Sequence, residues 1–185
     1  MLIISSAVLL QACVPAAIVG GTAVAAKVIT DPRTVGTQID DETLEERVLF
    51  NLRRDPQIRK DARLNVVSYN NMVLLVGQVP NQALKDQAGN IAKGVEYVRG
   101  VFNQLTIGPK ISSGRVIKDS WVTSQAKSKL LVTKGIKSND IKVVTENGVV
   151  YLMGDVTKQE ATLVVDTVRY LDGVKKVVVL FQYLN

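Results

Sequence analysis

The chain contains no histidine and a single cysteine, Cys13, so few routes to side-chain chemistry are available to it. Without imidazole there can be no Ser-His-Asp or Cys-His nucleophile system and no histidine metal ligand. One cysteine forms neither an internal disulfide nor a cysteine-cluster zinc site. The acidic residues are scattered without a convincing pair, which makes hydrolysis by carboxylates a weak hypothesis. The sequence therefore favours binding or assembly over catalysis, with no cofactor and no metal.

Cys13 follows an apolar run, Leu2 to Ala12, that carries no charge. Eleven residues are too few to span a bilayer, which needs about 20, and the run fits the apolar region of an export signal. The alternative is an ordinary N-terminal helix in which Cys13 is a free or buried thiol. The segment after the cysteine, rich in Ala, Gly and Val and then in turn-forming residues, is typical of a tether.

The motif Leu10-Gln11-Ala12-Cys13 resembles the lipobox of bacterial lipoproteins. The resemblance implies cleavage before Cys13 and acylation of its thiol and its new amino group. Val14 stands where an Asp would retain a lipoprotein in the inner membrane, so the family rule implies the outer membrane. We therefore expect a signal peptide over 1–12, a lipidated tether over 13–40 and a lipid anchor on the periplasmic face.

The rest of the chain repeats itself with a period near 77 residues. The run Val73–Val79 aligns with Val150–Val156 at that spacing (150 − 73 = 77), and Leu64–Val67 aligns with Ile141–Val144. Within each unit, two runs of alternating apolar residues predict a β-hairpin, and Asn147-Gly148 is a strong turn signal. Gly77 and Gly154, inside the strands, indicate a bulge or a close backbone approach.

Apolar residues at helical spacing follow each hairpin, a third strand follows each of these helices, and a further helix opens each unit. The opening helices are expected over 42–54 and 120–133. The predicted fold is α+β: two tandem αββαβ units, each a three-stranded mixed sheet covered by two helices. The expected division is a first domain over 41–108, a linker over 109–118 and a second domain over 119–185.

This pattern resembles the BON domain, on a repeated αββαβ unit with VxLxGxV in its hairpin and GVxxV before its last strand. Together with the lipobox and the tether, the chain from about Leu10 resembles outer-membrane lipoproteins that carry two BON domains. The resemblance implies phospholipid binding and a role in envelope integrity.

The two units differ in charge. Nine bases and eight acids between 41 and 107 give +1, whereas eleven bases and seven acids between 115 and 185 give +4, within a chain total of +6. A basic surface suits an anionic membrane or nucleic acid. An exported, acylated protein would rarely meet nucleic acid, and aromatic residues make up only 5% of the chain. Nucleic acid is therefore not expected as a partner.

The opening helix of the second unit contains the chain's one tryptophan, Trp121. A helical projection places Trp121 and Leu131 away from the expected core face, and Trp favours the bilayer interface. Thr43 holds the matching position in the first unit, so that unit is not expected to bind lipid but to set orientation or contact a protein. We expect an anionic phospholipid site formed by six residues: Trp121, Ser124, Lys127, Ser128, Leu131 and Lys134.

Three other interpretations remain open at this stage. In the first interpretation, Trp121 packs between the two units. In the second, the chain is a non-enzymatic scaffold that contacts outer-membrane assembly proteins through the basic helix. In the third, it is a periplasmic osmotic-stress protein with the same repeats, against which the acylation motif at Cys13 argues.

Overall fold

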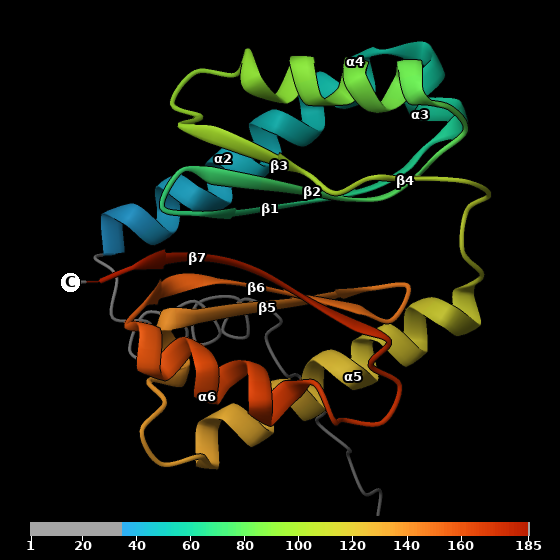
Figure 1. Cartoon of the computed structure of the whole chain (residues 1–185). Coiled ribbons are helices and arrows are strands. Elements are labelled where there is room, and N and C mark those ends of the chain that lie inside the picture. Colours follow the sequence, from blue (N-terminus) through green and yellow to red (C-terminus); the bar gives the residue numbers. More distant parts are fainter. Residues whose placement is uncertain (1–34, 185) are drawn as a thin grey trace, which may run out of the picture.

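The computed structural model describes residues 35–184, which form two α+β domains stacked through their sheets (Figure 1). The expected signal peptide and Cys13 lie outside these residues. The first domain consists of α2 (Val35–Arg54), α3 (Pro56–Asp61), β1 (Arg63–Tyr69), β2 (Met72–Val79), α4 (Gln82–Lys93), β3 (Gly100–Asn103) and β4 (Thr106–Ile107). The second consists of α5 (Ser113–Val132), the short 3₁₀ helix η1 (Ser138–Asp140), β5 (Ile141–Glu146), β6 (Val149–Val156), α6 (Lys158–Val168) and β7 (Lys176–Tyr183).

The predicted αββαβ order is confirmed in both domains. In each sheet the second strand of the hairpin is central: β2 is antiparallel to β1 and parallel to β3 and β4, and β6 is antiparallel to β5 and parallel to β7. The parallel pairs follow from the helical crossovers through α4 and α6. The first sheet gains the two-residue strand β4, which gives it four strands where three were expected.

Both opening helices begin earlier than the periodicity predicted. The helix α5 starts at Ser113, because the Ser112 hydroxyl caps it by accepting from the backbone N–H of Arg115 at 3.3 Å. Residues 113–118, expected as linker, are therefore its first two turns. Likewise α2 starts at Val35, inside the segment expected as tether.

The two glycines expected at close approaches occupy equivalent positions in β2 and β6. Gly77 has φ +129° and lies against the carbonyl of Arg63, while Gly154 has φ +157° and lies against that of Asp140. A Cβ at either position would overlap the carbonyl oxygen. Glycine is therefore required in both strands for steric as well as conformational reasons.

Apolar side chains of the central strands are buried on both faces. On one face of β2, Val73 and Leu75 pack under the helices, and on the other Leu74 and Val76 face the second domain. The interdomain core combines residues of both sheets: Val67, Tyr69, Leu74, Val76, Tyr151 and Met153. The result is four layers, with helices outside and two sheets inside (Figure 1).

Candidate functional site

The outward side of α5 carries a continuous row of residues, which we call the outer stripe: Ile117, Trp121, Ser124, Ser128 and Leu131. Steps of three and four residues keep these positions on one side of a helix. Ile117, Trp121 and Leu131 are 70%, 66% and 69% exposed. Three large apolar side chains exposed on one helical face are unusual for a surface that contacts only water, and such a patch indicates a binding surface.

The opposite side of α5 forms part of the core of the second domain. Val122, Ala126 and Leu130 are buried there, as the helical projection predicted. Trp121 is therefore not packed between the two domains, and the interpretation that placed it there is wrong. The interdomain contact is made instead by the sheet faces.

Lysines border the outer stripe. Lys118, Lys127 and Lys129 are exposed on the helix, and Lys134 is exposed in the turn that follows it. The acid on α5, Asp119, is directed inward and is 3% exposed. The cations at the edges of the stripe therefore have no acidic neighbour on the solvent side of their own helix.

The hydroxyl groups of Ser124, in the stripe, and of Ser120, beside it, form hydrogen bonds within the helix. The Ser120 hydroxyl donates to the carbonyl oxygen of Val116 at 3.1 Å, and the Ser124 hydroxyl donates to that of Ser120 at 3.0 Å. Such back-bonded hydroxyls need no further acceptor for their proton. Ser128 is exposed and equally small, so the large apolar side chains of the stripe, Ile117, Trp121 and Leu131, stand beside small hydroxyl residues.

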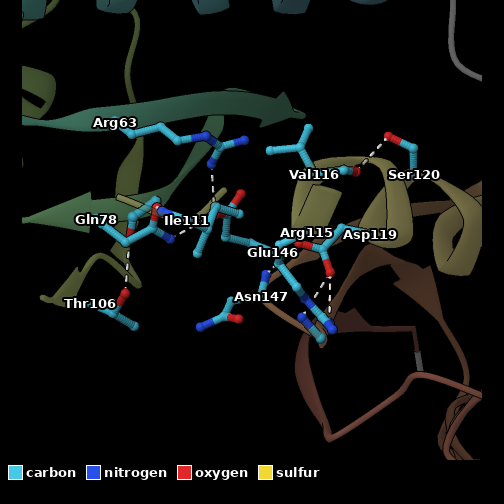
Figure 2. Close-up of polar contacts among 12 residues, drawn as sticks. Arg63, Gln78, Thr106, Ile111, Arg115, Val116, Asp119, Ser120, Glu146 and Asn147 are labelled. Atoms are coloured by element: carbon cyan, nitrogen blue, oxygen red, sulfur yellow. Dashed lines mark hydrogen bonds and ion pairs between the residues drawn. The ribbon is translucent and has the colours of Figure 1, made fainter. Parts of the chain in front are cut away.

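Asp119 fixes α5 to the hairpin of its own domain (Figure 2). Its two carboxylate oxygens accept from the backbone N–H groups of Asn147 and Gly148 at 2.7 and 2.9 Å. Arg115 Nη2 lies 2.8 Å from the same carboxylate. A buried carboxylate with these partners holds the helix, and with it the stripe, in a fixed rotation against the sheet.

A polar network joins the domains beside α5. Glu146 of β5 accepts from Arg63 Nη1 at 2.6 Å and from Gln78 Nε2 at 2.7 Å, both from the first domain (Figure 2). A hollow of about 430 Å³ borders this network, and its lining includes Arg63 together with Ser120 and Ser124 of α5. The candidate surface is thus continuous with the first domain.

Some of these features were missed from the sequence. Ile117 and Lys118 lie on the candidate surface, and the signal that extends the helix to include them is the capping residue Ser112 before Gly114 and Arg115. The partner of Asp155 in β6 was missed as well: its carboxylate accepts from Asn70 Nδ2 of the first domain at 2.7 Å, because the two sheets stack.

The first domain presents a different surface at the equivalent place. In its helix α2, Thr43 occupies the position equivalent to Trp121, as expected, and the acidic Glu46 occupies the position equivalent to Ser124. An exposed aromatic, Phe50, was not anticipated there. Arg47 lies 5.9 Å from the ring centre of Tyr97, a cation–π contact that further distinguishes this face.

Within residues 35–184, no helix combines the length and apolar character that crossing a membrane requires. The same residues contain no group of three or more cysteine, aspartate or glutamate side chains positioned to hold a metal ion.

Comparison with known proteins identifies the repeated unit. The BON domain family matches residues 40–109 and 118–185. Outer membrane lipoprotein DolP of Haemophilus influenzae is 52% identical over 184 residues, 100% of this chain and 95% of that protein. The 21 kDa hemolysin of Actinobacillus pleuropneumoniae is 44% identical (84% and 80%), and Osmotically-inducible protein Y of Escherichia coli is 32% identical (82% and 76%).

Proposed function

The chain belongs to the BON domain family, and from that premise we propose that it is an outer-membrane lipoprotein whose second domain binds anionic phospholipid without catalysis. The localisation rests on its similarity to an outer membrane lipoprotein along the whole chain. In this proposal Cys13 carries the anchor, and binding contributes to envelope integrity from the periplasmic face.

The observation that carries the proposal is the outer stripe of α5. Inserted at the depth of the headgroups, Trp121 and Leu131 each gain up to roughly 2 kcal/mol from removal of apolar surface from water. The Trp121 ring also suits this depth because its N–H keeps a polar partner there. Each bordering lysine adds about 1 kcal/mol near an anionic leaflet.

A second, weak contact is useful to a protein that is already anchored. Acyl chains on Cys13 confine the domains near the bilayer, so the effective lipid concentration at the stripe is high. Modest affinity then suffices to set the orientation of the domains against the membrane, and it leaves the contact reversible.

The test is co-sedimentation with vesicles of phosphatidylethanolamine, with or without phosphatidylglycerol. The mature chain from residue 13 is used with Cys13→Ser, so that no acyl chain contributes. Trp121→Glu/Leu131→Glu is expected to weaken binding to the anionic vesicles at least tenfold. Tyr97→Glu/Tyr170→Glu is the matched control, because it adds the same two charges at exposed positions (64% and 76%) that follow α4 and α6 and do not belong to the stripe.

Unchanged binding by the Trp121→Glu/Leu131→Glu variant, with an unchanged thermal unfolding midpoint, would show that the stripe is not the lipid contact. Photo-crosslinking from position 121 in cells distinguishes lipid binding from the alternative, in which the chain is a scaffold for outer-membrane assembly proteins. Capture of an outer-membrane assembly protein in place of lipid would favour the scaffold.

A further inference from the structure

The first domain contains a basic depression at the end of α2, which we call the cationic hollow. It has a volume of about 320 Å³ and is lined by Arg53, Arg59, Arg63 and Lys110 over an apolar floor of Leu49, Ile58, Ala62 and Leu64. No acidic side chain is among the lining residues. Four cations without a lining acid create a local positive potential that an anion would relieve.

The cations come from separate elements that the fold brings together. Arg53 lies in the last turn of α2, Arg59 lies in α3, Arg63 opens β1, and Lys110 follows β4. Lys110 is held in place by donating from Nζ to the carbonyl oxygen of Lys60 at 2.8 Å. The tight connection between α2 and α3 is capped by Asp55, which accepts from the N–H groups of Gln57 and Ile58 at 2.9 Å.

Two of the arginines are available to a ligand. Arg63 is paired with Glu146 at 2.6 Å, but neither Arg53 nor Arg59 makes an ion pair or side-chain hydrogen bond within the described part of the chain. Asp55, the nearest acid in sequence to Arg53, is engaged by the α3 cap and by Gln87. Both guanidinium groups therefore keep donors free.

From this arrangement we infer that the cationic hollow binds a phosphate group carried by an ester. The planar guanidinium fork donates two parallel hydrogen bonds to phosphate oxygens, and three of the four cations here are arginines. The apolar floor suits the carbon skeleton of the ester.

The bilayer is the source of phosphate that best fits the position of the hollow. Arg63 lines both the cationic hollow and the neighbouring hollow that includes Ser120 and Ser124, next to the outer stripe. One membrane surface can then be contacted by α5 and by the first domain together. This choice of source rests on the proposed function, whereas phosphate binding itself does not. From Thr43 in the place of Trp121, the first domain was predicted not to bind lipid. The hollow lies towards the C-terminal end of α2, where it is lined by Leu49 and Arg53, so this inference departs from that prediction.

The charge-removing variant Arg53→Gln/Arg59→Gln tests the inference in the mature Cys13→Ser chain. Binding to phosphatidylglycerol vesicles is expected to fall roughly tenfold or more, since each cation contributes about a fivefold factor near an anionic leaflet. Lys93→Gln/Arg99→Gln is the matched control. It removes the same charge from exposed positions of the same domain, at the end of α4 and before β3, and is expected to bind within about twofold of wild type.

A second arm distinguishes the source of the phosphate. NMR signals of the Arg53 and Arg59 Nε–Hε groups are followed while inorganic phosphate or glycerol 3-phosphate is added. Saturable shifts of these signals support a site for soluble phosphate, and loss of vesicle binding alone supports a lipid headgroup. If the double variant binds vesicles as wild type does and neither arginine signal shifts, the inference is overturned.

The outcome is separable from that of the proposed function. If Trp121→Glu/Leu131→Glu loses vesicle binding while Arg53→Gln/Arg59→Gln keeps it, and the arginine signals do not shift with phosphate, the stripe is supported as the lipid contact and the phosphate site in the hollow is refuted. The reverse pattern would refute the lipid contact at the stripe and support the phosphate site in the hollow.

Discussion

Asp41 and Asp119 are equivalent residues, one in each domain, and each binds the hairpin turn of its own sheet. Asp119 accepts from the N–H groups of Asn147 and Gly148, and Asp41 accepts from those of Asn70 and Asn71 at 2.9 Å. The turns have different sequences, but both contain residues with positive φ. In each turn, a carboxylate on the opening helix accepts hydrogen bonds from the backbone N–H groups. The opening helix and the hairpin are thus joined in the same way twice.

Removing this carboxylate should destabilise the second domain. Asp119→Ala leaves the buried N–H of Gly148 and the charge of Arg115 without their partner, and a loss of about 3 kcal/mol in the free energy of unfolding is expected. Urea denaturation measures it. Asp166→Ala, which removes a half-exposed ion pair with Arg169, is the control and should change stability by less than about 0.5 kcal/mol. Equal effects of the two substitutions would contradict this role for Asp119.

The contact between Arg63 and Glu146 should couple the two domains energetically. A double-mutant cycle with Arg63→Ala and Glu146→Ala is expected to give an interaction free energy of about 1–2 kcal/mol, because the pair is largely removed from water. Glu146→Ala alone should lower the free energy of unfolding more than Arg63→Ala does, since it also deprives the buried Gln78 amide of its acceptor. A cycle value near zero would mean that the pair does not hold the domains together.

Alkaline pH should weaken the interdomain core through Tyr151. Burial, and then the charge of Glu146, raise the pKa of the Tyr151 phenol above its ordinary value of 10.0. The folded state therefore holds this proton more tightly than the unfolded state. Its contribution to stability is complete below about pH 10 and is lost as pH rises through the folded-state pKa.

Urea unfolding of wild type and Tyr151→Phe between pH 8 and pH 11 tests this titration. The difference in unfolding free energy should be constant below about pH 10 and should shift in favour of the variant above it. Tyr170→Phe, at an exposed position, serves as the control. Parallel curves for wild type and Tyr151→Phe over the whole range would refute the assignment.

The two strand glycines should be among the least replaceable residues. Gly77→Ala or Gly154→Ala introduces a Cβ into a neighbouring carbonyl at positive φ, and a loss of at least about 3 kcal/mol is expected for each. Gly114→Ala is the control: it lies in α5, where a Cβ would meet only the Ser112 hydroxyl at an ordinary contact distance of 3.9 Å, so alanine should be neutral or slightly stabilising. Thermal unfolding midpoints suffice to rank the three variants, and a native-like midpoint for Gly77→Ala would show that the strand can shift.

Local features of this fold were predictable from the sequence because they depend on neighbouring residues. The Asn147-Gly148 turn was expected from its composition and has φ values of +50° and +79°. The exposure of Trp121 and Leu131 followed from helical periodicity, since the buried positions Val122, Ala126 and Leu130 occupy the other side. Both depend on spacing alone.

The stacking of the sheets was not predicted. The run Val73–Val76 is apolar at every position, a pattern typical of a strand buried on both faces, but the pattern does not say what covers the second face. That cover is the other domain, and its position gives Asp155 and Glu146 partners far away in sequence. The cationic hollow likewise depends on residues from three elements, α2, α3 and β1, and on Lys110 in the segment after β4.

The shared seam between the sheets has a consequence for truncated forms of the protein. A half cut off from its twin would expose Leu74 and Val76, or Tyr151 and Met153, to water. Such a fragment is expected to self-associate, with two identical copies pairing as the unlike halves do here, or to be cleared by proteases. Each domain thus covers the apolar sheet face of the other, so deletion of one domain is expected to cost the stable fold of both.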